Sequence, residues 1–533
     1  MIVRSRVSLL AALLVLAAGA TASPGRAQVP HDGVEHPEMF AERRAELLRR
    51  LPPGAVAVFH AKPVYERNND VNHPYRQASN FYYLTGFEEP EAVAVLSNAG
   101  EGPAYTLFVR PRNADPFDAE GEIWAGKRWG TEGARQVFKA EAAYVIDSLP
   151  AVLPRLVRGA SDVLYSSAGA PDFGERLRGW AGPGAGGGPA ANAGFESPDA
   201  IVHEMRLILS PAEVVRVQRA IDITAEAQRA SMRAARPGMY EYELEALQYY
   251  LYRVNGSRRW GFPSIVGSGP NSVTLHYEEN DRRMEDGDVV VLDIGAEYAM
   301  YTADVTRTIP VNGRFTPEQR EVYQVIVDAQ DAAMELMRPG NTIAQSSARA
   351  AEVVTRGLVR LGLLQGSVEE NLRSGAYRRF YMHGLSHWIG LDVHDPAPYS
   401  EPDGSPRVFR SGMVLSNEPG IYVRAGTPGV DPKWFAIGVR LENDVLITEG
   451  DPVDLTAAVP RTIAEVEAEM AKPALTIDTG AARPPLTPPR VPAGVAPSPE
   501  VSNRTLGGQD RDVTPPPRVT PPSQGKPKGE PRP

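Results

Sequence analysis

The chain has 533 residues, 42% of them hydrophobic and 23% charged, which is the composition of a soluble globular protein. Its length exceeds that of one ordinary domain, so we expect two folded units with tails. The formal net charge is −10 and no dense block of Lys or Arg occurs, which argues against nucleic acid as a partner because phosphate binding needs a basic face.

The first 27 residues predict a secretory signal peptide. Arg4 and Arg6 precede a short apolar segment, Val7 to Gly19, and small residues follow it. Cleavage after Ala22 or after Ala27 fits the pattern, and we favour Ala27. The apolar segment is shorter than the ~20 residues that a membrane anchor needs. No later segment is long and apolar enough to cross a bilayer, so we expect no stable membrane span in the mature protein.

The absence of cysteine restricts the chemistry further. An exported protein without cysteine has no disulfides, so its stability must come from its core, and a bacterial periplasm or the cell exterior is the expected location. Cysteine catalysis, zinc sites built from cysteine and a lipid-modified N-terminal cysteine are excluded.

A mixture of helical and strand patterns follows the predicted signal. The segment HPEMFAERRAELLRR has apolar residues at helical spacing, and Pro52 and Pro53 end the pattern. The segments AVAVFHA, FYYLTGF, EAVAVLS, AYTLFVR and AAYVID predict strands mixed with helical stretches. Residues 181–194 are so rich in glycine that we expect a flexible loop near a domain boundary.

A second unit begins at the segment LSPAEVVRVQRA. Ser210 and Glu213 have the spacing of a capping box, and the helix should run to about Ala235. Arg236-Pro237-Gly238 and then a second helix follow. The same order of helix, Arg-Pro-Gly and helix recurs around Arg338-Pro339-Gly340, which indicates two structurally similar halves.

The end of the chain has a different composition. Residues 472–533 are rich in proline and contain few large apolar residues. Such a segment cannot bury enough surface to offset its chain entropy, so we expect a disordered tail.

Two acids interrupt apolar runs in the segment GDVVVLDIGAEYAMYTADVTRTIPV. A buried charge is costly unless it is paired or bound to a metal. If the turn lies between Tyr298 and Ala299, then Asp293 and Asp304 face each other across an antiparallel hairpin, where like charges repel. A cation between them would convert that repulsion into attraction. A shared proton, or one acid turned to solvent, is the alternative.

Two more acids occupy similar settings. Glu418 ends an apolar run beside a Pro-Gly turn, and Glu442 lies in a predicted strand with Arg440 two residues away on the same face. Alone, each acid would more often be a surface residue at a strand end. Their significance comes from the whole set of acids together with a histidine.

Three of the nine histidines lie in the single stretch FYMHGLSHWIGLDVHD. They are His383, His387 and His394, and the first two share one face of either a helix or a strand. Histidine is the residue best suited to binding transition metals and to moving protons near neutral pH. A fourth, His276, follows a glycine-rich turn and has a weaker local signal.

Four carboxylates and one imidazole favour hard or borderline divalent ions, with Mn²⁺ first and Co²⁺, Zn²⁺ or Fe²⁺ as alternatives. Four negative charges exceed what one such ion compensates. Two ions roughly 3.5–4 Å apart, bridged by carboxylates, would balance the charge and generate a nucleophile for hydrolysis. Amide and phosphate ester bonds are the two obvious targets.

These residues, in this order, resemble the metal-dependent peptidases with the pita-bread fold, and most closely aminopeptidase P. The motifs that carry the resemblance are GSGPNSVTLHYEEND, LDIGAEYAMYTADVTRTIPVNG, MHGLSHWIGLDVHD, NEPGIY and GVRLENDVLIT. FYYLTGFEEPEAVAVL resembles the N-terminal domain of aminopeptidase P, prolidase and creatinase. The resemblance implies an α/β (α+β) fold, with a pita-bread catalytic domain of pseudo-symmetric halves at residues 205–471. A smaller mixed α/β N-terminal domain at residues 36–200 would precede it.

The resemblance also implies a role for each candidate residue. The metal ligands would be Asp293, Asp304, His387, Glu418 and Glu442, with Asp304 and Glu442 bridging both ions. Glu418 would also take a proton from the attacking water, and Arg440 would orient Glu442. The substrate pocket would be lined by His276, His383 and His394, which polarise the carbonyl or help the amine to leave. The implied reaction removes the N-terminal amino acid from peptides with proline at the second position, and the implied assembly is a homodimer or homotetramer.

Several other functions compete with this hypothesis. Prolidase activity on Xaa-Pro dipeptides is the nearest, and the string LHYEEND with Ser386 and Trp388 favours aminopeptidase P over it. A creatinase-like hydrolase would lack the acid ligands, a two-metal phosphoesterase would need basic residues near the acids, and a non-catalytic exported peptide-binding protein would be expected to have lost a ligand. Three features depart from the family pattern: the Ser-Asn pair before Glu418, the glycine-rich loop and the proline-rich tail.

Overall fold

The computed structural model describes residues 36–100, 102–112, 126–167, 170–181 and 196–474. All of these residues belong to one compact unit. The predicted signal peptide, nearly all of the glycine-rich loop and nearly all of the proline-rich tail lie outside the described residues. Within the described part of the chain, no helix combines the length and the apolar character needed to span a bilayer.

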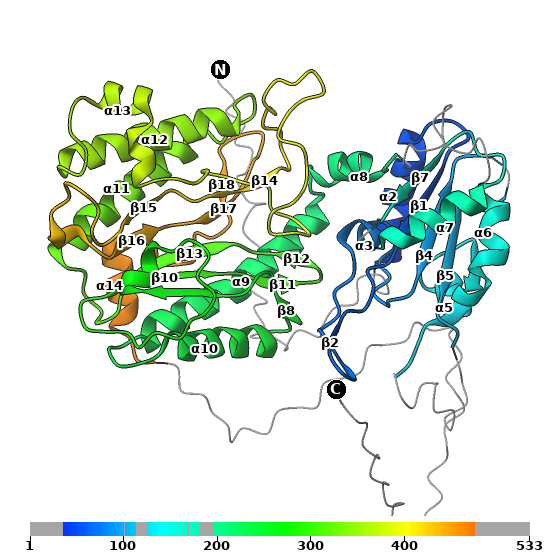
Figure 1. Ribbon diagram of the computed structural model, residues 1–533, viewed down its shortest axis with the longest axis horizontal. Coiled ribbons are helices and arrows are strands. Elements are labelled where there is room, and N and C mark those ends of the chain that lie inside the picture. The colour runs from blue at the N-terminus through cyan, green and yellow to red at the C-terminus, as the bar shows by residue number, and fades with distance from the viewer. Residues whose placement is uncertain (1–35, 101, 113–125, 168–169, 182–195, 475–533) are drawn as a thin grey trace, which may run out of the picture. The chain divides into compact units, whose positions relative to one another are not determined.

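The N-terminal part is a mixed five-stranded sheet with helices packed around it (Figure 1). Its strand order is β6-β5-β4-β1-β7, and β1 pairs antiparallel with β4 but parallel with β7. The strands are β1 (Val56–His60), β4 (Val93–Ser97), β5 (Tyr105–Val109), β6 (Ala142–Val145) and β7 (Val163–Ser166), and a small hairpin joins β2 (Glu66–Asn68) to β3 (Val71–Asn72). The helices are α2 (Pro37–Arg50), α3 (Ser79–Thr85), α5 (Gly130–Gln136), α6 (Leu149–Val157) and α7 (Pro171–Ala181).

One predicted element of this part has the wrong type. The segment FYYLTGF forms the helix α3 rather than a strand, and Gly86 ends that helix with a positive φ of 66°. Aromatic residues favour strands on average, but here Phe81 and Tyr82 are both almost completely buried. Strand propensity largely measures how well a residue fits a half-buried sheet surface. These aromatic residues are instead buried on all sides, so tertiary packing rather than strand propensity decides the conformation.

The C-terminal part contains two pairs of long helices. They are α9 (Pro211–Ala234) with α10 (Glu241–Val254), and α11 (Pro317–Met334) with α12 (Ile343–Arg360); the shorter helices are α8 (Asp199–Arg206), α13 (Val368–Ser374) and α14 (Ile463–Met470). The capping box predicted at Ser210 and Glu213 is present. Gly238 and Gly340, which end the two Arg-Pro-Gly turns, have the same positive φ of 93°. The sequence echo therefore reflects a repeated backbone turn that favours glycine.

Antiparallel strands lie between the two helix pairs (Figure 1). The first half contributes β8 (Arg259–Trp260), β9 (Ile265–Ser268), β10 (Val289–Ile294), β11 (Ala296–Tyr298), β12 (Tyr301–Thr302) and β13 (Val305–Pro310). The second half contributes β14 (Val414–Asn417), β15 (Gly420–Val423), β16 (Ile437–Arg440), β17 (Asn443–Leu446) and β18 (Val453–Asp454). A single apolar cluster that includes Leu292, Ile326 and Val439 joins α11 to strands of both halves, so the two halves share one core.

The hairpin that carries Asp293 and Asp304 has a different register from the one expected. Asp293 pairs with Thr306, and Tyr298 pairs with Tyr301. The direct pairing of the two acids is therefore wrong, and Asp304 is instead the diagonal neighbour of Asp293 on the same face. The turn centres on Ala299 and Met300, which have positive φ angles of 51° and 71°. Turns of this kind normally carry Asn or Gly, so the local sequence contains no signal for this one.

A buried ionic cluster surrounds the end of α8. The guanidinium of Arg206, only 3% exposed, donates to Asp392 at 2.7 Å and to Asp395 at 2.5 Å. It also donates to the side-chain oxygen of Asn80 at 2.7 Å. Asp392 and Asp395 flank His394 in the chain, so this cluster anchors the loop on which that histidine lies.

Replacing Arg206 with Met should lower the free energy of unfolding by about 3–5 kcal/mol, because it leaves the buried carboxylate of Asp395 without its cationic partner. Thermal and denaturant unfolding measure the effect. Arg356→Met is the matched control, since Arg356 pairs with Glu352 on an exposed face of α12 and exposed pairs contribute little. Equal losses in the two variants would contradict the importance of the buried cluster.

Candidate active site

The structure brings together five side chains that lie far apart in the sequence. Asp293 is the penultimate residue of β10 and Asp304 immediately precedes β13, while Glu418 follows β14 and Glu442 lies between β16 and β17. His387 belongs to a loop that exchanges hydrogen bonds with Ser416 of β14. The four acids lie at or near strand ends of the shared core, and His387 is hydrogen-bonded to β14, so the group is held rigidly.

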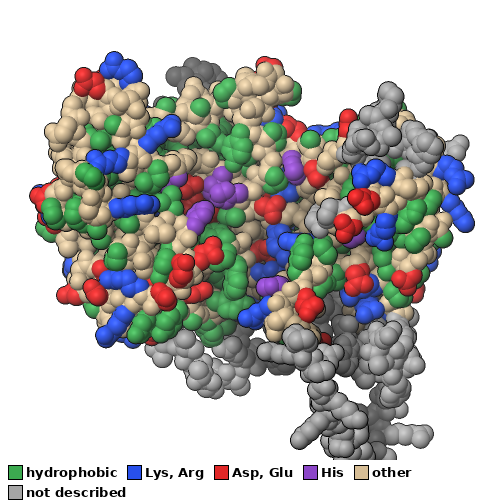
Figure 2. All heavy atoms as spheres, in the orientation of Figure 1, with side chains coloured by type: hydrophobic (Ala, Val, Ile, Leu, Met, Phe, Trp, Pro, Cys, Tyr) green, Lys and Arg blue, Asp and Glu red, His purple; other side chains and the backbone are tan. Residues whose placement is uncertain are grey.

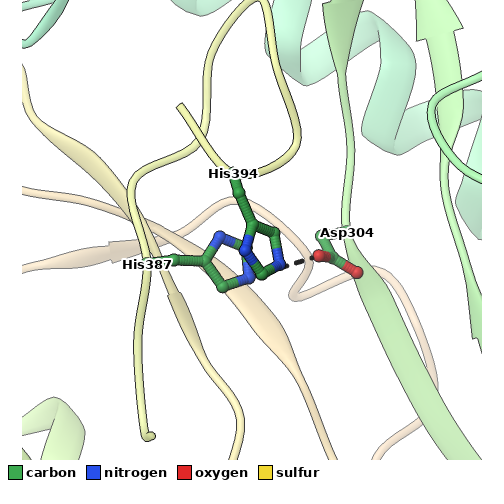
Figure 3. A group of neighbouring side chains, drawn as sticks. All are labelled: Asp304, His387 and His394. Atoms are coloured by element: carbon green, nitrogen blue, oxygen red, sulfur yellow. Dashed lines mark ion pairs between the residues drawn. The ribbon is translucent and has the colours of Figure 1, made fainter. Parts of the chain in front are cut away.

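His387 lies at the centre of this group. Its Nε2 atom is 3.4 Å from Asp304 Oδ2 (Figure 3), 3.5 Å from Glu418 Oε1 and 3.8 Å from Glu442 Oε1. Its Nδ1 atom is 3.2 Å from the carbonyl oxygen of Trp388. A proton on Nδ1 would be donated to that carbonyl, which turns the lone pair of Nε2 toward the three carboxylates. This is the arrangement of a metal-binding histidine that is oriented by a backbone carbonyl.

The carboxylates leave several oxygen atoms without partners. Asp293 Oδ1, Asp304 Oδ1 and Glu442 Oε1 are buried and accept no hydrogen bond from the described residues. Ligand atoms of Asp293, Asp304 and Glu442 lie within 4.8 Å of one another, and so do those of His387, Glu418 and Glu442. Unsatisfied buried acceptors converging on two overlapping groups are what bound cations require, so the residues present fit a pair of divalent ions.

The electrostatics of the cluster support the same interpretation. Burial, followed by the charges of Glu442 and Asp293, raises the pKa of Asp304 well above its ordinary value. Burial, followed by the charge of Glu442, does the same to the pKa of Glu418. Burial disfavours a proton on His387, but the neighbouring carboxylates outweigh it and raise the pKa of that ring. Burial disfavours the charge of Glu442, but the neighbouring His387 outweighs it and lowers the pKa of that acid. Protons therefore bind Asp304, Glu418 and His387 more readily than they bind free side chains, and metal ions would displace them.

Arg440 contacts a different acid from the one expected. Its guanidinium donates to Asp293 Oδ2 at 2.5 Å and to the hydroxyl of Tyr422 at 2.9 Å. It reaches Glu442 only through Thr306, whose hydroxyl accepts from Arg440 at 3.3 Å and donates to Glu442 at 2.7 Å. The expected pairing on one strand does not occur, because the chain leaves the sheet between β16 and β17.

His383 is held as a neutral ring. Its Nε2 atom is 2.9 Å from the Tyr422 hydroxyl, and its Nδ1 atom is 2.8 Å from the carbonyl oxygen of Gly384. Because Arg440 donates to the Tyr422 oxygen, the hydroxyl proton is free to point at His383. Burial, with a smaller contribution from Arg440, lowers the pKa of His383 to about 4. His383 also lies 3.6 Å from Glu418.

The other two candidate histidines lie at the edge of the cluster. His394 stacks on His387 with ring centroids 3.8 Å apart (Figure 3), and burial followed by the charge of His387 lowers its pKa to about 4. His276 is exposed, and a charge on it would disfavour protons on both His383 and His394. Figure 2 shows histidine side chains gathered on one face next to acidic ones.

Two residues at the site were missed by the sequence interpretation. Tyr422 links Arg440 to His383, and fully buried Asp444 accepts a hydrogen bond from the backbone of Asp304 at 3.1 Å. The only available signal was spacing, since each follows a candidate acid, Glu418 or Glu442, by an even number of residues. That spacing is also common in ordinary strands, so it could not single these residues out.

Family signatures match both parts of the chain. The signature of metallopeptidase family M24 covers residues 215–449, and that of the aminopeptidase P N-terminal domain covers residues 40–165. The chain is 40% identical to the Xaa-Pro aminopeptidase of Escherichia coli (strain K12), covering 81% of this chain and 97% of that protein. It is 31% identical to Xaa-Pro aminopeptidase 1 of Streptomyces coelicolor, covering 81% of this chain and 86% of that protein.

Solved structures of aminopeptidase P are also similar to this chain. Aminopeptidase PepP of Pseudomonas aeruginosa has a TM-score of 0.77 at 40% identity, covering 82% of this chain and 98% of that one. A variant of E. coli aminopeptidase P in complex with substrate has a TM-score of 0.75 at 38% identity, covering 81% of this chain and 98% of that one. The predicted fold class, a pita-bread domain preceded by a smaller mixed α/β domain, is confirmed by these matches.

Divalent cations should bind the metal-free protein with release of protons and should raise its melting temperature. Ligands for the folded state stabilise it, and cations would displace protons from the groups whose pKa is raised, Asp304, Glu418 and His387. Calorimetric titration in buffers of different ionisation enthalpy measures the proton release.

Asp304→Asn should weaken this binding strongly, while Asp222→Asn, on the exposed side of α9, should not. Binding of equal strength in both variants would show that the cations bind elsewhere.

Proposed function

The chain belongs to metallopeptidase family M24, among the Xaa-Pro aminopeptidases, and we propose that it hydrolyses the bond between an N-terminal amino acid and a following proline. A protein of that name is 40% identical over nearly its whole length. An aminopeptidase P variant whose structure matches this one was solved with substrate. The substrates proposed here are therefore peptides with proline at the second position.

The observation that carries the proposal is the cluster around His387. Nε2 of that ring faces three carboxylates at 3.4, 3.5 and 3.8 Å, and three buried carboxylate oxygens of the cluster accept no hydrogen bond from the described residues. We propose that Asp293, Asp304 and Glu442 hold one divalent ion and that Asp304, Glu442, His387 and Glu418 hold a second. Oxygen-rich ligands with a single imidazole favour Mn²⁺. Bound ions would polarise the scissile carbonyl and lower the pKa of the attacking water.

Glu418 is the proposed general base. Its side chain is 18% exposed, whereas those of Asp304, His387 and Glu442 are all 7% exposed or less, so it is the acid best placed to meet a substrate. It takes a proton from the attacking water and delivers it to the proline nitrogen as the peptide bond breaks.

The surrounding residues orient the reacting groups. Both nitrogens of His383 are occupied by Tyr422 and Gly384, so we propose that this ring positions Glu418. His276 and His394 are more accessible and would contact the substrate, as hydrogen-bond donors to its carbonyl or its amine. Burial raises the pKa of Asp293, and the guanidinium of Arg440 partly offsets this effect because it favours the charged carboxylate.

Export and self-association are further parts of the proposal. Arg4, Arg6 and the apolar residues 7–19 support a signal peptide, with cleavage after Ala27 and a periplasmic or extracellular location. Resemblance to the family supports a homodimer or homotetramer.

Metal-stripped mature protein, supplied with Mn²⁺, should release the first residue of an Xaa-Pro-Yaa tripeptide. The Xaa-Pro dipeptide is run alongside, since its cleavage alone would indicate a prolidase. Glu418→Ala should reduce kcat by at least about a hundredfold, because it removes the proton acceptor, and amino acid release measured by chromatography tests this. Metal binding without cleavage of either peptide would leave only a binding function.

Tyr422→Phe should lower kcat/KM by roughly tenfold, the effect of one lost hydrogen bond worth about 1.4 kcal/mol, because His383 loses its partner. Tyr323→Phe is the matched control, since it also removes a buried hydroxyl, one that donates to the Arg461 carbonyl at 2.6 Å. Steady-state kinetics on the tripeptide compare the two. A similar loss in both variants would mean that the Tyr422 hydroxyl has no special role.

A further inference from the structure

A buried carboxylate outside the metal cluster lies beneath the loop that carries His276. Glu241 is the first residue of α10 and has no exposed surface. It belongs to none of the carboxylate and histidine groups that could hold an ion. A fully buried acid of this kind is costly to keep unless its oxygens are well satisfied.

The loop satisfies both oxygens of Glu241. Oε1 accepts from the backbone nitrogen of Ser268 at 2.7 Å, from its hydroxyl at 2.6 Å and from the side chain of Asn271 at 3.3 Å. Oε2 accepts from the hydroxyl of Tyr277 at 2.8 Å and from the backbone nitrogen of Arg282 at 2.9 Å. One carboxylate therefore ties the beginning of the loop to its end, with hydrogen bonds of the strong, charge-assisted kind.

A second buried side chain closes the base of the same loop. Asn280 accepts from the backbone nitrogen of Val266 at 2.9 Å and donates to the carbonyl oxygen of Ser264 at 2.8 Å. Between these ties, the carbonyl oxygen of Leu275 accepts from Arg440 at 3.3 Å. His276 therefore lies between Leu275, whose carbonyl oxygen accepts from Arg440, and Tyr277, whose hydroxyl donates to Glu241.

We propose that Glu241 is a positioning residue that holds His276 at the rim of the active site. This inference rests on the proposed peptidase function, because the position of His276 matters only if that ring contacts the substrate. Glu241 itself touches no reacting atom. It acts through Tyr277 and through the two ends of the loop, so that His276 keeps its place next to Leu275, whose carbonyl accepts from Arg440.

The alternative is that Glu241 only stabilises the fold. The two roles differ in how its replacement combines with loss of His276. A positioning residue has nothing left to position once the imidazole is gone, whereas a general stabiliser costs activity to the same extent in either background. A double-mutant cycle with His276→Ala separates them.

The test replaces Glu241 with Gln, which keeps the shape but turns an NH₂ group toward donors that now lack an acceptor. Glu241→Gln should lower kcat/KM for the Xaa-Pro-Yaa tripeptide by between about tenfold and a hundredfold, as expected for a small displacement of a substrate-contacting group. In the His276→Ala background the same change should cost less than about twofold. Equal losses in both backgrounds, or no loss in the wild-type background, would overturn the proposal.

Glu243→Gln is the matched control, because it changes an exposed acid of the same helix turn whose capping-box role Gln can also serve. It should leave kcat/KM unchanged. Tyr277→Phe is a second variant, in case Glu241→Gln folds poorly, since it removes only the contact next to His276. Tyr277→Phe should lower kcat/KM by less than Glu241→Gln does. In the His276→Ala background it should leave kcat/KM unchanged.

Hydrogen–deuterium exchange distinguishes failure of this proposal from failure of the proposed function, since it needs no activity. Glu241→Gln should speed exchange in residues 268–282 relative to Glu243→Gln, with unchanged exchange in β10. If wild-type protein cuts neither peptide but the loop still loosens, the positioning of His276 stands and the peptidase function fails. An unchanged loop would overturn the inference.

Discussion

The mutual repulsion of buried carboxylates is the constraint on which this structure depends. Asp293, Asp304 and Glu442 are each 7% exposed or less, and their oxygens approach one another closely enough to share a cation. Apolar packing around them prevents water from screening the charges. Such a cluster is tolerable only with protons or cations in it, and the lone pair of His387 favours cations.

The fold supplies the rigidity that this arrangement needs. Two similar halves, each with a pair of long helices, share one apolar core, and the acids lie where strands of the two halves end. No single half contains the complete group, since Asp293 and Asp304 come from the first and the remaining members from the second. The complete group of site residues therefore forms only when both halves of the domain are folded together.

Polar contacts behind the cluster extend that rigidity to the residues proposed to meet the substrate. Arg440 connects Asp293, Tyr422 and the carbonyl of Leu275, and Tyr422 continues the chain of contacts to His383. Arg206 secures the loop on either side of His394. The side chain of His383 and the segments that carry His276 and His394 are thus each restrained by contacts from outside the metal cluster, as expected for a preorganised site.

The residue types of the site, and their order along the chain, could be predicted from patterns in the sequence. Acids within apolar runs and a local excess of histidine are visible without a structure, because buried charge is costly and histidine is scarce. The repeated Arg-Pro-Gly turns also revealed the two halves. Only the tertiary structure decided the register of Asp293 against Asp304, since the turn at Ala299 and Met300 lacks the usual turn residues. It likewise decided that FYYLTGF is a helix and that Arg440 contacts Asp293, because burial and contacts between distant strands, rather than local spacing, select among conformations that the sequence permits.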